Sequence, residues 1–222
     1  MSNANITLAI ETAVAGGSLS LFRGKTVIDR WAGVNDVSRS EELLASIGEI
    51  LKRNRLLPVD LSRLAVSLGP GSYTGARIGL STAIGLKNGL NIECVGTSIF
   101  EALFHSSKDE KRELVGALPF GKNEVCFQFC KKEISDNGES ADDPKILQFE
   151  KFIEQIDKTP NARLITTQKV YARLEGQIGN EIIDAGVHLS DYIGRMILDG
   201  KGSKHLRPIY VLSSVNRILL PK

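Results

Sequence analysis

The sequence predicts an α/β protein, and three observations carry this prediction. Three β-type segments come first, and helical and β-type segments then alternate through the first half of the 222-residue chain. Strands that alternate with helices pair in parallel through right-handed crossovers. The third observation is a glycine-rich bend between one such strand and the next helix. Such a bend either holds an anion or brings a helix very close to a neighbour.

The first three strands are expected at residues 6–11, 18–22 and 26–31. The first is an apolar, β-branched run, and the second alternates small polar and apolar residues, as a strand with one solvent-facing side does. Gly24 and Lys25 form a plausible hairpin turn into the third strand. We therefore expect three antiparallel strands in series.

An amphipathic helix is expected next. Ser38 or Ser40 can cap its first turn, and Pro58 forces a break after its last turn. Its apolar residues recur at helical spacing, and they are Leu43, Leu44, Ile47, Ile50 and Leu51.

The other elements of the first half alternate between strand and helix. A charged, serine-bearing link over residues 106–112 follows them, so we expect a first lobe at residues 1–107. The elements are strands at 64–68 and 92–95 and helices at 74–87 and 98–105.

The second half repeats roughly the same order with weaker elements, and it is expected to form a second, smaller lobe at residues 108–222. The stretch 135–144 is rich in acidic residues, Gly and Ser and is interpreted as a loop. Strands are expected at 114–118, 124–131, 163–166 and 181–183, and helices at 149–157 and 189–198.

The composition narrows the class of protein. The formal net charge of +2 does not by itself indicate nucleic-acid or membrane binding. Three cysteines fit no paired framework and favour a reducing compartment, and Cys126 and Cys130 are interpreted as buried apolar residues. No apolar run approaches the roughly 20 residues of a membrane span, and no secretory signal is visible, so we expect a cytoplasmic protein without a membrane partner.

The glycine-rich bend allows two interpretations, of which the first is an anion site. A phosphate loop would need a lysine after Gly75, which is missing, and the dinucleotide fingerprint fails because its third glycine comes one place late. A generic anion site at the start of the following helix stays open, with Gly71 and Ser72 as weak candidates for cofactor binding.

The second interpretation is steric, and we favour it. Gly75, Gly79 and Ala83 are spaced four apart and form a strip of nearly bare backbone. Each interior helix glycine costs about 0.8–1 kcal/mol relative to alanine, so a close contact with another helix must compensate for it. That helix belongs either to this chain or to another subunit.

Candidate catalytic residues are few. His105, His188 and His205 are far apart and form no His-x-x-x-His pair, and no Gly-x-Ser-x-Gly elbow is present. Glu11, at the end of the first strand, could hold a hydrated cation or could simply bond to backbone. We therefore expect no catalytic residue and no metal site in this chain.

The C-terminal segment, residues 201–222, is basic and contains no acidic residue. Such a patch can neutralise phosphates of RNA, or it can be ordinary solvated charge, and both interpretations stay open. Its basic residues are Lys201, Lys204, Arg207, Arg217 and Lys222.

Several of these segments resemble the TsaB family, also called YeaZ and labelled glycoprotease-like, of bacterial tRNA threonylcarbamoyladenosine biosynthesis. The run Gly-Pro-Gly-Ser-Tyr-Thr-Gly-x-Arg-Ile-Gly is highly specific for that family. The resemblance is close in the first half and sparse in the second. The matching segments are 6–12, 40–44, 68–87, 95–98, 101–103 and 207–210.

The resemblance implies an actin-like, ribonuclease-H-like fold with two lobes, each a mixed sheet flanked by helices. It implies a non-catalytic scaffold that pairs with a TsaD-like catalytic subunit, which binds ATP and metal and modifies adenosine 37 of tRNA. A TsaE-like ATPase joins the assembly, and a homodimer through the same helices is plausible. The alternative is a nucleotide-binding hydrolase or phosphotransferase of the actin and sugar-kinase class that uses Glu11 and the glycine-rich bend.

The resemblance also implies that the partner interface uses the helix after Ser40 and the helix after Gly75. Two departures argue against a nucleotide site: Glu11 stands where the family commonly has Asp, and residues 119–122 replace a frequent Asp-Ala-Arg segment. Arg39 stands where the family commonly has His. The expected interface residues are Ser40, Glu41, Leu44, Ile47, Gly48, Leu51, Tyr73, Gly75, Ala76, Ile78, Gly79, Thr82 and Ala83.

Overall fold

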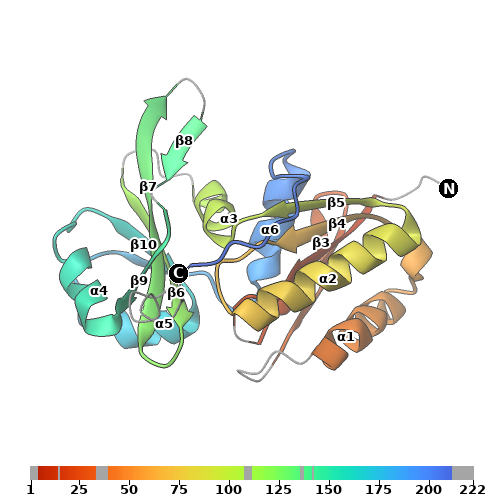
Figure 1. The fold of residues 1–222 in the computed structure, drawn as a ribbon, viewed down its shortest axis with the longest axis horizontal. Coiled ribbons are helices and arrows are strands. Elements are labelled where there is room, and N and C mark those ends of the chain that lie inside the picture. The colour runs from red at the N-terminus through yellow and green to blue at the C-terminus, as the bar shows by residue number, and fades with distance from the viewer. Residues whose placement is uncertain are drawn as a thin grey trace, which may run out of the picture. The chain divides into compact units, whose positions relative to one another are not determined.

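The computed structural model describes residues 5–14, 16–33, 40–107, 112–135, 138–141 and 143–211, and the structural statements below concern these residues. The chain forms two compact units. The first comprises residues 1–106 and 187–209, and the second comprises residues 107–186 and 210–222. Each unit is a mixed sheet flanked by helices, so the predicted α/β class is confirmed (Figure 1).

The sheet of the first unit has five strands in the order β3-β2-β1-β4-β5. The first three strands pair antiparallel in series, as predicted, and β1, β4 and β5 pair in parallel. Every residue of β1 is buried, as expected for a central strand that is covered on both faces. The strands are β1 (Ile6–Glu11), β2 (Ser18–Arg23), β3 (Thr26–Ala32), β4 (Leu61–Ser67) and β5 (Glu93–Thr97).

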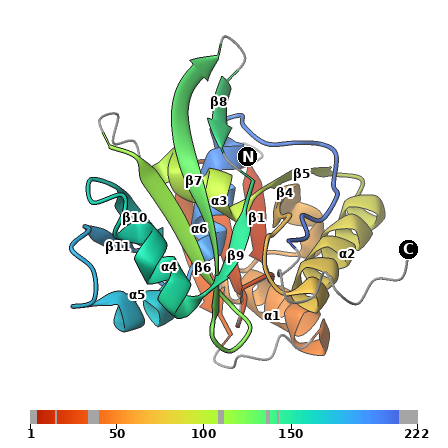
Figure 2. The ribbon, with the colours of Figure 1, turned by 60° about the vertical axis from the view of Figure 1, so that its left-hand side comes forward.

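Two layers of helices cover this sheet. In one layer α1 packs against α2 and β3, and α2 packs against β1, β4 and β5. In the other layer α6 packs against the same central strands and α3 packs on α6 (Figures 1 and 2). These helices are α1 (Ser40–Arg53), α2 (Tyr73–Leu90), α3 (Ile99–Ser106) and α6 (Leu189–Leu198), and a short 3-10 helix, η1 (Pro58–Asp60), precedes β4.

Strand β3 ties both helix layers to the edge of the sheet. Successive side chains of a strand point to opposite faces. The Asp29 carboxylate accepts hydrogen bonds from Arg53 and Asn54 at the end of α1, and the neighbouring Arg30 pairs with Asp191 in the first turn of α6. One short segment of edge strand therefore fixes one end of a helix on each side.

The division of the chain differs from the expected one, because residues 187–209 return to the first unit instead of staying with residues 108–186. The buried hydroxyl of Ser20 on β2 is hydrogen-bonded to Ser190 and Asp191 of α6. Gly194 brings α6 close to the sheet, since a Cβ there would overlap the buried ring of Phe22. The sequence correctly predicts the helix at 189–198, but the lobe that it covers depends on these distant contacts.

The second unit has a six-stranded sheet in the order β11-β10-β6-β7-β8, with β9 also paired to β7. Its core is aromatic, with Phe127, Phe149 and Phe152 buried together. Its elements are β6 (Leu114–Phe120), β7 (Glu124–Ser135), β8 (Gly138–Ala141), β9 (Lys145–Gln148), α4 (Phe149–Ile156), β10 (Arg163–Thr166), α5 (Gln168–Leu174) and β11 (Ile182–Asp184).

Two features of this unit correct the sequence prediction. Residues 138–141 form strand β8 inside the stretch interpreted as a loop, because their backbone groups pair with the long strand β7. Helix α5 was not expected, and its buried residues Val170 and Leu174 pack on the aromatic core. Cys126 and Cys130 are buried, as predicted, and burial raises the pKa of Cys126 to about 12. No helix of the described chain has the length and apolarity needed to cross a membrane.

We expect Gly194→Ala to destabilise the protein by up to about 2 kcal/mol. Alanine favours a helix by about 1 kcal/mol over glycine, but overpacking against Phe22 costs about 1–3 kcal/mol. The matched control is Gly85→Ala in α2, where a Cβ would meet no atom within 4 Å. The control should gain up to about 1 kcal/mol in urea unfolding, and a stabilised Gly194→Ala would contradict the packing described here.

Candidate functional site

The loop after β1 and the first turn of α2 are in direct contact. The buried hydroxyl of Thr12 donates a hydrogen bond to the carbonyl oxygen of Gly75 at 2.7 Å. The N–H of Ser72, which caps α2, donates to the carbonyl oxygen of Ala13 at 2.7 Å. The glycine-rich bend therefore packs its helix onto the end of the first strand.

Glycines make this contact possible. A Cβ on Gly75 would overlap the carbonyl oxygen of Thr12, and a Cβ on Gly79 would overlap the Thr12 hydroxyl. A Cβ on Gly71 would overlap the carbonyl group of Ala13. The steric interpretation of the glycines is thus the one that the structure supports.

The structure corrects the predicted neighbour of the small residues on α2. Gly75, Gly79 and Ala83 are buried against this chain's own sheet and loop, so they do not offer bare backbone to a helix of a neighbouring subunit. The compensating close approach is made by the loop at Thr12, which is not a helix. This correction follows from the tertiary fold, because the spacing of small residues does not say what lies opposite them.

Glu11 is buried beside the same loop. One of its carboxylate oxygens, Oε1, accepts hydrogen bonds from the N–H groups of Ala13 at 2.5 Å and Val14 at 3.0 Å. Successive backbone N–H groups of this kind form a concave site for an anion. In this chain an oxygen of the protein's own Glu11 side chain occupies these N–H groups, so of the two interpretations of Glu11 the structure shows backbone bonding.

Burial raises the pKa of Glu11 from its ordinary value of 4.5 to about 7, against the opposing effect of the Val14 and Ala13 N–H groups. The two other weak candidates for cofactor binding are also engaged within the chain. The Ser72 hydroxyl accepts the N–H of Gly75 as the cap of α2, and Gly71 lies against Ala13. These backbone and side-chain groups are used in holding the loop and the helix together.

The three histidines lie apart, in line with their spacing in the sequence. His105 is hydrogen-bonded to Asp199, which also pairs with Lys25. His188 precedes α6, and His205 is exposed. No three His, Cys, Asp or Glu side chains of the described residues are grouped so that they could hold a metal ion.

The expected interface residues divide into three groups. Those buried within the first unit are Ile47, Leu51, Gly75, Ala76, Gly79 and Ala83, while Ile78 and Thr82 are half-buried. Leu44, Gly48 and Tyr73 are exposed, with relative accessibilities of 58% for Leu44 and 57% for Tyr73. Ser40 and Glu41 begin α1, but their side chains, like Ser38 and Arg39, lie outside the described part of the chain.

The outward face of the α1–α2 layer also contains residues that sequence reasoning missed. Ser81, Gly85 and Gly89 are exposed and form a second stripe of small residues along α2. A Cβ on Gly48 of α1 or on Gly85 would meet no atom within 4 Å. Unlike Gly75 and Gly79, these glycines serve no close contact in the described chain. We call the exposed surface made by Leu44, Gly48, Tyr73, Ser81 and Gly85 the outer helix face.

The fold defines the broad class of this protein. A YeaZ structure from Pseudomonas aeruginosa superposes with a TM-score of 0.65 at 16% identity, and covers 93% of this chain and 100% of that chain. A Bacteroides thetaiotaomicron protein with an actin-like ATPase fold superposes with a TM-score of 0.50 at 11% identity, over 89% of this chain and 96% of that chain. The chain therefore has the predicted actin-like fold.

The sequence comparisons then give the family. The family model described as "TsaD: tRNA N6-adenosine threonylcarbamoyltransferase" matches residues 35–181. Proteins named "tRNA threonylcarbamoyladenosine biosynthesis protein TsaB" are 34% identical in Bacillus subtilis (43% of this chain, 42% of that protein) and 32% identical in Haemophilus influenzae (61% and 59%). The chain belongs to the family that this model describes and, within that family, to the TsaB (YeaZ) group. The matches span about half the length of these curated relatives.

We expect Glu11→Gln to remove a pH dependence of stability. Between pH 4.5 and about 7 the folded protein keeps the Glu11 proton while the unfolded chain loses it, so rising pH costs up to about 3 kcal/mol through this group. Glutamine stays neutral and keeps an oxygen for the two N–H groups. Unfolding midpoints of the variant should therefore fall less than those of the wild type from pH 4.5 to 7.5. Parallel curves for the two proteins would exclude a raised pKa.

We expect the substitutions Gly79→Ala and Thr12→Ala to be coupled. Gly79→Ala forces the Thr12 hydroxyl away from Gly75, and it should destabilise the protein by about 1–3 kcal/mol. In the double variant the colliding hydroxyl is gone, so its loss should be smaller than the sum of the single losses by at least about 0.5 kcal/mol. Strict additivity in chemical unfolding would show that the two residues do not meet.

Proposed function

We propose that this chain is a non-catalytic scaffold for the threonylcarbamoylation of adenosine 37 in tRNA. The observation that carries this proposal is the closed loop after β1, in which the N–H groups of Ala13 and Val14 bind the Glu11 carboxylate. A solved structure with a TM-score of 0.54 to this chain, an activator of a dehydratase from Clostridium difficile, is described with bound ADPNP. The same fold can thus hold a nucleotide, and the internal carboxylate argues against that use here.

The catalytic partner is a TsaD-like subunit. The relatives are named for threonylcarbamoyladenosine biosynthesis, and the family model describes the transferase itself. We assign ATP and metal binding to that subunit, and we include a TsaE-like ATPase in the assembly. Buried cysteines that form no disulfide in the described chain, together with a tRNA substrate, fit a cytoplasmic location.

The partner-binding surface is the outer helix face. Leu44 and Tyr73 expose large side chains there, and aromatic residues such as tyrosine are enriched where subunits meet. Gly48 and Gly85 each cost the helix about 1 kcal/mol, and nothing in the described chain compensates for them. A helix of another subunit that approaches closely at these positions would supply the missing contacts. The same face supports a homodimer when the partner is absent.

Co-purification of the chain with the TsaD-like subunit of the same genome tests the proposal. Both variants change the outer helix face: Leu44→Glu places a charge at a side chain that is 58% exposed, and Gly85→Trp places bulk where a Cβ would meet no atom within 4 Å. We expect each variant to keep the wild-type unfolding midpoint to within a few degrees, and to weaken the complex at least tenfold.

The matched controls make the same chemical changes elsewhere. Val59→Glu alters a residue that is 75% exposed, and Gly179→Trp alters a glycine where a Cβ would meet no atom within 4 Å. Both controls should bind the TsaD-like subunit as the wild type does. Full binding by the two outer-face variants would reject this surface, and a wild-type chain that never binds a TsaD-like subunit would reject the scaffold function.

A further inference from the structure

The segment after α6 is an extended ridge that is fixed to the edge of the first sheet. Ser203 and Gly96 of β5 exchange both backbone hydrogen bonds, each at 2.8 Å. Further along, the N–H of Ile209 donates to the carbonyl oxygen of Leu68 at 2.7 Å. We call residues 201–209 the basic ridge, and these bonds hold its backbone in one place.

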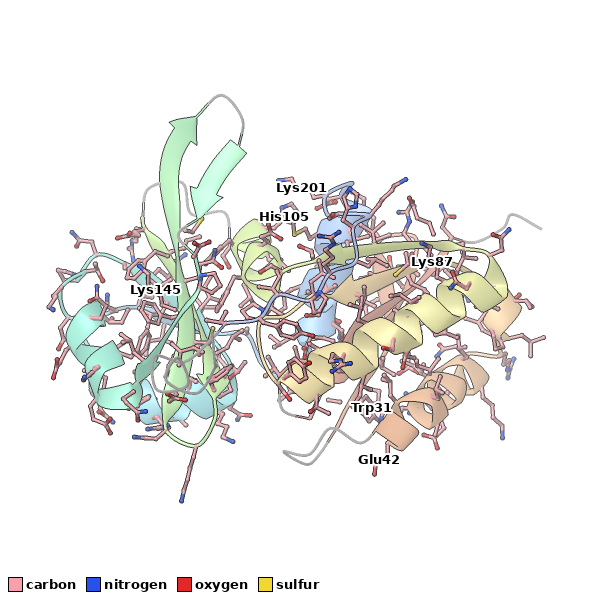
Figure 3. The ribbon with its side chains drawn as sticks, in the orientation of Figure 1. Trp31, Glu42, Lys87, His105, Lys145 and Lys201 are labelled. Carbon is pink, nitrogen blue, oxygen red and sulfur yellow. The ribbon has the colours of Figure 1, made fainter. Side chains whose placement is uncertain are left out.

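Some side chains of the basic ridge pack on the core of the first unit, and others are exposed to solvent. Leu206 and Ile209 pack against the core of the first unit, and Gly202 lies so close to β5 that a Cβ would press on Val95. The exposed residues are Lys201, Lys204, His205 and Arg207, and the ridge contains no acidic residue. Lys201 lies beyond the end of α6, at the start of the ridge (Figure 3).

Two carboxylates beside the ridge are already occupied by other partners or by Lys204. Glu93 of β5 pairs with Lys204 at 2.9 Å and with Arg63 at 3.2 Å. Asp199, just before the ridge, pairs with Lys25 at 2.7 Å and is hydrogen-bonded to His105. Within the described chain no carboxylate is paired with Lys201 or Arg207, so their charges are left for an outside anion.

We propose that the basic ridge contacts the phosphodiester backbone of RNA. The proposal rests on the proposed function, because that function supplies a tRNA as the substrate of the assembly. Lysine and arginine on a fixed backbone suit phosphate contacts, which position a nucleic acid without reading its sequence. The exposed ridge residues 201–207 include no large apolar side chain that could enter a bilayer, so a lipid surface is the weaker fit.

The test is the binding of fluorescently labelled tRNA to the full-length chain, alone and in complex with its TsaD-like subunit, at several salt concentrations. The variant is Lys201→Gln together with Arg207→Gln, which leaves the Lys204–Glu93 pair and the ridge backbone intact. Two lost phosphate contacts should lower the slope of log affinity against log salt by about 1.5, and should weaken binding about tenfold or more at 0.1 M salt.

The matched control is Lys145→Gln with Lys158→Gln, which removes two exposed lysines of the second unit. It should retain wild-type affinity and slope. An unchanged slope in the ridge variant, or an equal loss in the control, would overturn the proposal. So would wild-type protein that binds phosphatidylserine vesicles through the ridge and does not bind tRNA.

Co-purification with the TsaD-like subunit is measured on the same ridge variant. It should be unchanged, because neither Lys201 nor Arg207 belongs to the outer helix face. A chain that binds tRNA through the ridge but never binds a TsaD-like subunit would reject the scaffold function and keep the ridge. If the chain binds the subunit but the ridge variant binds tRNA as the wild type does, the ridge proposal is rejected and the scaffold function is kept.

Discussion

The contact between Thr12 and Gly75 is the constraint on which the first unit depends. It joins the end of the central strand to the first turn of α2 through a buried hydrogen bond, and it requires glycine at positions 75 and 79. With α2 held there, the small residues of its inner side are buried and its opposite side is exposed. The direction in which this helix faces follows from one close approach.

The same constraint supports the proposal that this chain does not hold a nucleotide. The loop between Thr12 and Val14 is pressed against α2, and its N–H groups bind the carboxylate of Glu11. An external phosphate would have to displace a buried group that is attached to the adjacent strand. Because the Glu11 side chain belongs to the same chain, its effective concentration at the loop is high, and a dilute ligand does not match it. In the described chain the loop after β1 is thus held by the protein's own groups.

Much of the first unit could be predicted from its sequence because its signals are local. Three of these signals depend only on neighbouring residues. They are the turn at Gly24, the apolar spacing of α1 and the break at Pro58. The return of α6 to the first sheet could not be predicted in this way, since it depends on Ser20 and Phe22 some 170 residues earlier in the chain. Strand β8 was missed for the same reason, because it exists through its pairing with β7.

The sequence could show that small residues line α2, but it could not show which of them face the interior of the protein. Small residues recur every four positions on two sides of α2, at Gly75 and Gly79 and again at Ser81 and Gly85. Only the tertiary structure shows that the first stripe is buried and the second exposed. Arg217 and Lys222 of the basic tail lie outside the described residues, so the ridge represents the part of that tail that is placed.

The central claim is that the loop after β1 is satisfied by the chain's own groups, and calorimetric titration of the isolated chain with Mg-ATP tests it most directly. The account predicts no binding heat up to millimolar nucleotide, for the wild type and for Glu11→Gln alike. Sub-millimolar binding by the wild type that disappears in Glu11→Gln would contradict the account, because it would show that Glu11 serves a nucleotide site instead of closing one.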